Sequence, residues 1–123
     1  MAQRPLVSIV DDDQSVRESL PDLLKVFGFE ARAFSSAEEF LASDCIDKCR
    51  GLIIDIALPG LSGLELQEEL KRRGLKIPIL FITAQADAAL RQRAIANGAV
   101  ECLFKPFSDT ALLEVLNVAM QIR

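Results

Sequence analysis

The chain has 123 residues, of which 50% are hydrophobic and 26% charged, and its formal net charge is −4. This length suits one domain, which can bury about two-thirds of the surface that its unfolded chain exposes. No apolar stretch approaches the roughly 20 residues that span a bilayer, which argues against a transmembrane segment. The negative balance and the lack of a Lys/Arg cluster argue against nucleic acid as a partner of this domain.

The residue types restrict the chemistry that the chain can perform. The first residues, Met-Ala-Gln-Arg-Pro, lack a secretory signal pattern, so we expect the protein in the cytoplasm. Three cysteines, Cys45, Cys49 and Cys102, match no zinc or disulfide framework and are expected to be reduced thiols. Histidine is absent, which excludes Ser-His-Asp and Cys-His nucleophiles and His-ligated zinc within the chain. Any chemistry that the chain performs must therefore use carboxylates, hydroxyls, a lysine and a bound ion.

In chain order, five short apolar runs alternate with stretches of helical periodicity, and each such pair predicts a strand followed by a helix. The strands are predicted to begin near residues 6, 30, 51, 78 and 100, with the second covering Ala31–Phe34. The helices are predicted at about 14–27, after Ser36, at 63–73, at 87–97 and after Ser108. Five units of this kind indicate an α/β fold with a parallel sheet.

Local signals mark where these helices begin and end. The apolar stripe of the first helix ends at Gly28, a residue typical of helix ends. Ser36 with Glu39 has the spacing of a capping box at the start of the second helix, and Ser62 with Glu65 has it at the start of the third. These signals support the predicted order of elements.

The first helix contains one residue that breaks a local rule. Pro21 removes a backbone hydrogen bond, at a cost on the order of 3 kcal/mol. We expect the helix either to kink there or to be held by its packing, because the apolar stripe continues on both sides of the proline. Asp13, just before this helix, is expected to serve as its N-cap.

Polar residues follow four of the apolar runs at the points where the runs end. Asp11 and Asp12 follow the first run, Asp55 the third, Thr83 the fourth and Lys105 the fifth. Parallel strands end at the same edge of a sheet, and ligands bind outside that edge. Each of these residues is uninformative alone, but four strands that deliver such groups to one edge predict a common site.

The charges of this site indicate its chemistry. Asp11, Asp12, Asp55 and Lys105 together sum to −2 when all are ionised. Crowded carboxylates raise one another's pKa unless a cation is present. A small number of oxygen ligands with room for water suits Mg²⁺ or Mn²⁺ better than zinc. Thr83 and Lys105 would contact the oxygens of an incoming phosphoryl group, and Asp55, flanked by apolar residues, is the expected nucleophile that becomes an acyl phosphate.

At these residues the sequence resembles the receiver domain of two-component response regulators, over about residues 5–122. The matching motifs, highly specific when taken together, are Val10-Asp11-Asp12, Asp55 followed by Leu58-Pro59-Gly60-Leu61-Ser62-Gly63, Ile82-Thr83-Ala84, Asn97-Gly98-Ala99 and Lys105-Pro106-Phe107. The segments that look most like the FixJ-type subfamily are Asp11-Asp12-Asp13, Ser15-Val16-Arg17 and Phe34-Ser35-Ser36-Ala37.

The resemblance implies a flavodoxin-like (CheY-like) three-layer fold, with a five-stranded parallel sheet in the order 2-1-3-4-5. It implies that Asp55 takes a phosphoryl group from the phospho-histidine of a sensor kinase. Mg²⁺ (or Mn²⁺) would be bound by Asp12, Asp55 and the backbone carbonyl of Ala57, with Asp11 acting through water. Ala57 and Gln85 would gate attacking water. Such a domain is not an enzyme in the usual sense, although it catalyses its own phosphorylation and slow dephosphorylation.

The resemblance also implies roles at the ends of the fourth and fifth strands. Thr83, Ala84 and Lys105 would bind the phosphoryl group and take part in switching. The bond between Lys105 and Pro106 would be a cis peptide. The family usually has an aromatic switch residue three positions before this lysine. Here that position is Cys102, which puts the aromatic mode of switching in doubt.

Phosphorylation is expected to change the conformation of the face built by the fourth helix, the fifth strand and the fifth helix. Thr83 and Lys105 lie where this face begins, so moving them toward a phosphoryl group would shift it. Arg91, Gln92 and Arg93 on the fourth helix would offer exposed polar contacts there. A phosphorylation-dependent homodimer through this face is one outcome that the resemblance allows. The expected partner is a sensor histidine kinase, in a pathway of transcription regulation.

The domain organisation is expected to be one receiver domain over residues 1–123. FixJ-type proteins usually carry a helix-turn-helix output domain after the receiver, and none follows here, so the chain is expected to be an isolated receiver or a fragment. No contact with nucleic acid or with a membrane is expected through this domain.

Two other classes share parts of the pattern. An aspartate-nucleophile phosphohydrolase of the haloacid-dehalogenase type needs a second Asp two residues after the nucleophile, where Ala57 follows Asp55. Asp11-x-Asp13 fits that spacing, but Ser15 stands where this class has Thr or Val. A pseudo-receiver, which serves only as a docking module, would have lost an Asp, Thr or Lys of the site, and none is lost.

Overall fold

The strands of the chain form one parallel sheet, as the apolar runs predicted. The computed structural model describes residues 4–85 and 87–121. The strands in chain order are β1 (Leu6–Val10), β2 (Glu30–Phe34), β3 (Gly51–Asp55), β4 (Ile79–Thr83) and β5 (Glu101–Phe104). They pair in the order β2-β1-β3-β4-β5, and every neighbouring pair is parallel. The predicted strand order is therefore confirmed.

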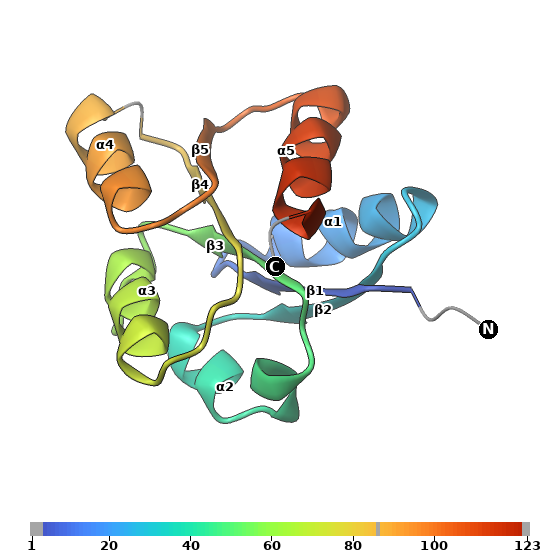
Figure 1. Cartoon of the computed structure of the whole chain (residues 1–123). Coiled ribbons are helices and arrows are strands. Elements are labelled where there is room, and N and C mark those ends of the chain that lie inside the picture. Colours follow the sequence, from blue (N-terminus) through green and yellow to red (C-terminus); the bar gives the residue numbers. More distant parts are fainter. Residues whose placement is uncertain (1–3, 86, 122–123) are drawn as a thin grey trace.

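Helices cover both faces of this sheet (Figure 1). One face carries α1 (Gln14–Val26) and α5 (Asp109–Gln121), and the other carries α2 (Ala37–Leu41), α3 (Gly63–Arg72) and α4 (Ala88–Ala96). A single 3₁₀ turn that the sequence did not predict, η1 (Asp44–Asp47), follows α2. The arrangement is the flavodoxin-like three-layer sandwich.

Each face of the sheet has its own hydrophobic core. On one side, Leu20 and Leu24 of α1 and Leu112 and Leu116 of α5 pack on the sheet. On the other side, apolar residues of α2, α3 and α4 pack around Phe81. Every residue of β3 and β4 is buried, as expected for central strands covered on both faces. These two strands therefore form a rigid support for the residues at their ends.

The first helix continues through its proline. Asp13 is the N-cap, because its carboxylate accepts a hydrogen bond from the Ser15 N–H at 3.0 Å. Helix α1 then runs to Val26 with Pro21 inside it. Leu20 and Leu24, on either side of the proline, are 5% and 0% exposed. Packing on the sheet thus outweighs the lost backbone hydrogen bond.

The two predicted capping boxes differ in the structure. The box of Ser62 and Glu65 is complete, with each side chain accepting a hydrogen bond from the backbone N–H of the other residue. At α2, Ser36 caps Glu39 as predicted, but the Glu39 carboxylate accepts from the N–H of Ser35. The predicted capping box at α2 was therefore wrong in one of its two hydrogen bonds, because the Glu39 side chain binds the N–H of Ser35 and not that of Ser36.

Two further expectations concern the chain as a whole. Cys45, Cys49 and Cys102 are free and buried, in agreement with the predicted thiols. Burial raises the pKa of the Cys49 thiol to about 11, so this cysteine is unreactive near neutral pH. Within residues 4–85 and 87–121, none of the helices combines the length and apolar character needed to cross a membrane.

Candidate functional site

The three carboxylates predicted to share a site do lie together. Asp11 directly follows β1, and Asp55 is the last residue of the neighbouring strand β3. Among the described residues, one carboxylate oxygen from each of Asp11, Asp12 and Asp55 lies within 4.8 Å of the others. Asp11 and Asp55 are buried, whereas Asp12 is exposed. The cluster therefore has a buried base and one carboxylate on the solvent side.

Lys105 reaches this cluster from the end of β5. Its Nζ lies 3.0 Å from Asp11 Oδ2 and 3.5 Å from Asp55 Oδ2. The backbone N–H of Lys105 donates to the Thr83 carbonyl at 2.7 Å, which ties the end of β5 to the end of β4. The bond between Lys105 and Pro106 is cis, as the resemblance implied. The lysine thus offsets part of the negative charge of two aspartates.

Backbone N–H groups and an arginine hold the aspartates in place. Asp55 Oδ1 accepts a hydrogen bond from the Ala57 N–H at 3.1 Å. Asp11 Oδ1 accepts from the Asp13 N–H at 2.9 Å. The Arg17 guanidinium donates to the Asp11 backbone carbonyl at 2.9 Å, a contact that no sequence signal indicated. These bonds leave the second oxygen of each carboxylate facing Lys105.

Gly63, the first residue of α3, packs directly on the backbone that carries Asp55. Its N–H donates to the Ile56 carbonyl at 3.0 Å. A Cβ at Gly63 would lie 2.5 Å from the Asp55 carbonyl oxygen and 2.8 Å from the Ile56 Cα. The sequence placed this glycine in a motif of the resemblance but gave no physical reason for it, because its contact depends on how α3 meets β3.

Burial governs the ionisation of the site. It raises the pKa of Asp55 above the ordinary 3.8, and the charge of Asp11 adds to the rise, while the Ala57 N–H and Lys105 act in the opposite direction. Burial alone would lower the pKa of Lys105, but the hydrogen bond to Asp11 and the charges of Asp55 and Asp11 raise it. The lysine therefore stays charged, and Asp55 is a carboxylate held in an unfavourable environment.

This environment predicts a pH-dependent stability. Because the pKa of Asp55 is raised, the folded protein binds this proton more tightly than the unfolded chain, so the contribution of Asp55 to stability falls as pH rises from about 3.8 through the folded pKa. Without divalent ions, Asp55→Asn should raise the thermal midpoint by a few degrees at neutral pH. Calorimetry across this range should show the gain vanishing near the lower limit. An equal gain at acidic and neutral pH would contradict the assignment.

Thr83 and its neighbours complete the edge. Thr83 ends β4 and is 1% exposed, and its Oγ1 accepts a hydrogen bond from the Gln85 N–H at 3.1 Å. Ala84 and Gln85 are exposed. Thr83 therefore lies between the ends of β3 and β5 with its hydroxyl proton free to be donated.

The predicted switch position and fourth helix differ in detail from expectation. Cys102 is 4% exposed and belongs to the core beneath α4. Of the three residues expected to offer exposed polar contacts, Gln92 and Arg93 are exposed, whereas Arg91 is partly buried and its Nη2 lies 2.8 Å from Glu101 Oε1 of β5. The same oxygen accepts from the Cys102 N–H at 2.9 Å. The Arg91–Glu101 ion pair, which joins α4 to β5, therefore lies beside Cys102, the residue that stands where the family usually has an aromatic side chain.

The donor set fits a hard divalent cation. Three carboxylates from two strand ends supply only oxygen, and the exposed position of Asp12 leaves room for water. The positive charge of such an ion would oppose the two effects that raise the pKa of Asp55, which are burial and the neighbouring charge of Asp11. The predicted contribution of the Ala57 carbonyl stays a prediction.

Comparison with known proteins agrees with this geometry. The family model for the response regulator receiver domain matches residues 7–117. Nodulation protein W of Bradyrhizobium diazoefficiens is 44% identical over 118 residues, which are 96% of this chain and 52% of that protein. The transcriptional regulatory protein FixJ of Rhizobium meliloti is 36% identical and is covered over 56% of its length. The chain thus spans about half the length of these relatives.

Solved structures show the same likeness. The response regulator StyR superposes with a TM-score of 0.89 at 44% identity, covering 97% of this chain and 60% of that one. FixJ-N superposes with a TM-score of 0.88 at 35% identity, covering 99% and 98%. Fold, site and sequence agree, and the chain belongs to the receiver domains of two-component response regulators, with FixJ-type proteins among its relatives.

Proposed function

We propose that Asp55 is the residue of this receiver domain that accepts the phosphoryl group, donated by a phospho-histidine of a sensor kinase. The observation that carries this proposal is the position of its carboxylate. Asp55 ends a buried strand, lies within 4.8 Å of two further aspartates, and has Lys105 Nζ at 3.5 Å from its Oδ2. Asp11 is fully buried and paired with Lys105 at 3.0 Å, which leaves it less available as a nucleophile.

In the proposed step, a carboxylate oxygen of Asp55 attacks phosphorus as the P–N bond to the histidine breaks. The electron pair of that bond stays on the imidazole, so Asp55 becomes an acyl phosphate. A Mg²⁺ ion held by Asp12, Asp55 and the Ala57 carbonyl, with Asp11 acting through water, would neutralise phosphoryl charge. Thr83 would donate its hydroxyl proton and Lys105 would exchange part of its contact with Asp11 for a phosphoryl oxygen. Ala57 and Gln85, both exposed, would control the approach of water.

The experiment that tests this function needs only a small phosphodonor. The protein is incubated with acetyl phosphate and Mg²⁺, and its intact mass is followed over time. A gain of one phosphoryl group supports the receiver activity. Rapid release of inorganic phosphate without an adduct would indicate a phosphohydrolase, and no change would indicate a docking module. Asp13, the second carboxylate that a hydrolase would require, caps α1 through Ser15, which speaks against the hydrolase.

We expect weak Mg²⁺ binding that depends on Asp12, because the site has few protein ligands. The expected dissociation constant is about 10⁻⁴ to 10⁻³ M, by comparison with the weakest carboxylate calcium modules. Titration should raise the thermal midpoint of the wild-type chain. Asp12→Ala should require at least about tenfold more Mg²⁺ for the same rise, and should be more stable than wild type without metal. Asp22→Ala, an exposed carboxylate of α1, is the control. Undiminished stabilisation in Asp12→Ala would contradict this assignment.

We expect the signal to leave through α4, β5 and α5. Thr83 and Lys105 are joined by a backbone hydrogen bond at the roots of these elements, and the Arg91–Glu101 ion pair links α4 to β5. Beryllofluoride with Mg²⁺ should therefore change amide chemical shifts most in the loop after Thr83, in α4 and in β5. Cys102 is too small to fill or vacate a large pocket, so the loop should carry most of the change. Larger changes in α2, with this region unmoved, would contradict the proposal.

The whole-protein context is also proposed from the relatives. A sensor histidine kinase is the inferred partner, the cytoplasm the inferred location, and control of transcription the inferred purpose, because relatives include transcriptional regulatory proteins. An output domain adjoining this receiver would account for the additional length of those relatives. Phosphorylation-dependent dimerisation through α4, β5 and α5 is testable by sedimentation with and without beryllofluoride.

A further inference from the structure

A basic hollow lies at the end of the sheet opposite to Asp55. It has a volume of about 630 Å³, and four cationic side chains line it, Arg4, Arg32, Lys48 and Arg50. Arg50 directly precedes β3, and Asp55 ends that strand five positions later, which is about 16 Å along a strand. The hollow is therefore distinct from the phosphorylation site.

The hollow lies beside the connection between β2 and β3, which supplies Lys48 and Arg50. Helix α2 of this connection spans five residues and η1 four, and at the start of the β2–β1–β3 surface Glu30 and Arg32 are exposed. Across this surface Leu6 pairs with Glu30 of β2, and its carbonyl accepts from the Arg50 N–H at 2.7 Å. Arg32 lies two residues after Glu30 and so faces the same side. Strand pairing thus brings Glu30 and Arg32 of β2 close to Arg50, which precedes β3, at the edge of the hollow.

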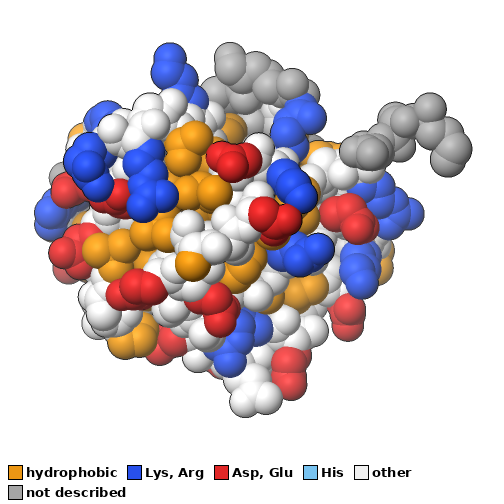
Figure 2. All heavy atoms as spheres, turned by 90° about the horizontal axis from the view of Figure 1, so that it is seen from below, with side chains coloured by type: hydrophobic (Ala, Val, Ile, Leu, Met, Phe, Trp, Pro, Cys, Tyr) orange, Lys and Arg blue, Asp and Glu red, His pale blue; other side chains and the backbone are white. Residues whose placement is uncertain are grey.

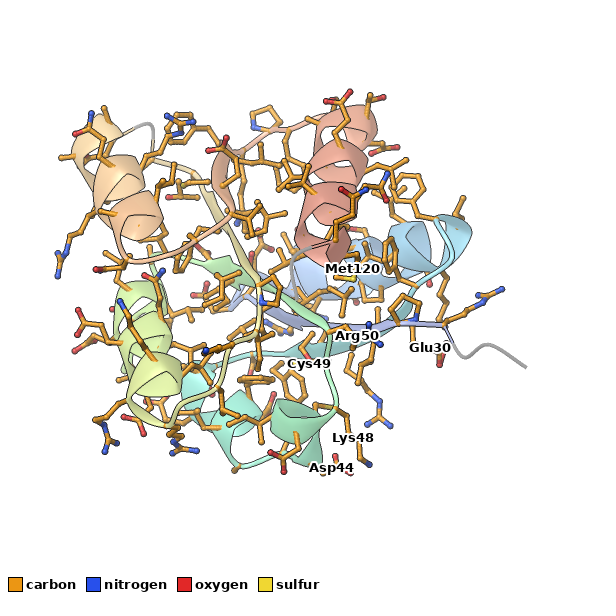
Figure 3. The ribbon with its side chains drawn as sticks, in the orientation of Figure 1. Glu30, Asp44, Lys48, Cys49, Arg50 and Met120 are labelled. Carbon is orange, nitrogen blue, oxygen red and sulfur yellow. The ribbon has the colours of Figure 1, made fainter. Side chains whose placement is uncertain are left out.

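The charges at this rim are not balanced within the described residues. One carboxylate, Glu30, lines the hollow with the four cations, so its net charge is +3, although the chain carries −4. Lys48 pairs with Asp44 at 2.9 Å. Figure 3 labels both residues, together with Arg50 and Glu30. In the described part of the chain, Arg4, Arg32 and Arg50 have no ion pair within 4.0 Å. Seen from below, Lys and Arg side chains occur on both the left and the right of the surface, with Asp and Glu side chains between them (Figure 2).

Several other arginines have partners within the chain. Arg72 and Arg73 both bind Glu69, Arg91 binds Glu101, and Arg17 donates to the Asp11 backbone carbonyl. The guanidinium groups of the hollow keep their donors for an external acceptor. Planar guanidinium groups bind phosphate and carboxylate oxygens in pairs, and several around one hollow favour an anion with more than one charged group.

We propose that this hollow binds a small ligand that carries two or more phosphate groups. Its volume lies within the roughly 300–1,000 Å³ of small-molecule sites. Three guanidinium groups that form no ion pair within the described residues match the charge of a diphosphate better than that of a single carboxylate. A nucleic acid duplex would require an extended basic stripe, whereas Glu30 and Asp44 interrupt the positive charge here.

Pyrophosphate is the probe for this proposal, titrated into ¹⁵N-labelled protein in buffer without divalent ions. The expected result is saturable shifts in the amides of residues 30–32 and 48–51, with no matching change at Asp55. Arg32→Gln with Arg50→Gln should weaken binding at least tenfold, because two of the four cations are removed. Arg32 and Arg50 are exposed, so the double variant is expected to fold. Lys25→Gln with Lys71→Gln removes the same charge from exposed sites on α1 and α3 and should change the affinity less than twofold.

Three results would overturn the proposal. Chemical shift changes that do not saturate would mean that pyrophosphate is attracted to the positive charge without a defined site. Equal weakening of pyrophosphate binding in the two glutamine double variants would mean the same. Tighter binding of a Glu-rich peptide than of pyrophosphate would assign the surface to an acidic polypeptide. A further variant, Arg32→Lys with Arg50→Lys, keeps the charge and removes the paired donors. It should bind pyrophosphate more weakly than wild type and more tightly than the glutamine variant. These readouts do not depend on phosphorylation of Asp55.

Discussion

Asp55→Asn is expected to abolish phosphorylation of the domain. An amide oxygen is a poor nucleophile and carries no charge for a metal ion, whereas the geometry of the site stays the same because Asn has the same shape as Asp. Ala57 N–H can still donate to the side-chain oxygen that accepts from it at 3.1 Å. Intact mass after incubation with acetyl phosphate and Mg²⁺ should therefore show no adduct, while thermal unfolding stays cooperative.

The matched control for this variant lies at the same edge of the sheet. Asp13→Asn makes the same chemical change at the N-cap of α1, and Asn caps helices as well as Asp does. This control should be phosphorylated at a rate close to that of wild type. Undiminished labelling of Asp55→Asn would show that another residue accepts the phosphoryl group, and loss of labelling in Asp13→Asn would show that the effect is not specific to Asp55.

Gly63→Ala is expected to destabilise the fold by about 2–4 kcal/mol. At most helix positions alanine is the better residue by roughly 0.5–1 kcal/mol. Here the added Cβ would lie 2.5 Å from the Asp55 carbonyl oxygen and 2.8 Å from the Ile56 Cα. Both atoms are backbone, so α3 or the end of β3 must move. Denaturant unfolding should report the loss, and phosphorylation should slow as Asp55 shifts.

Gly51→Ala is the control because its added Cβ is equally crowded but meets a different kind of atom. It would lie 2.6 Å from the Met120 Cε, the end of a flexible side chain. Methionine can turn aside, so the cost is expected to stay below about 1 kcal/mol. If the two alanine variants lose the same stability, the rigid contact between α3 and the Asp55 backbone is not what requires glycine at position 63.

Much of the candidate site could be predicted because its residues lie at one kind of position. A buried strand is visible as a short apolar run, and its end is visible as the first polar residue. Parallel strands end at one edge, so Asp11, Asp55, Thr83 and Lys105 could be assigned to one place without knowing how the side chains meet. The capping box of Ser62 and Glu65 was likewise a local pattern, complete within a few residues.

Contacts between elements were beyond this reasoning, because they depend on register and on how closely two elements approach. The pairing of Lys105 with Asp11 at 3.0 Å required the relative height of β1 and β5. The ion pair of Arg91 with Glu101 required the placement of α4 on β5.

The sequence by itself thus determined the five βα units and the sheet edge at which Asp11, Asp55, Thr83 and Lys105 meet, since both follow from local periodicity and from the first polar residue after each apolar run. Only the tertiary structure decided the need for glycine at Gly63 and the gathering of Arg4, Arg32 and Arg50 in one hollow. The sequence shows no basic cluster because these arginines lie far apart along the chain. Strand pairing brings them together, and all three are exposed.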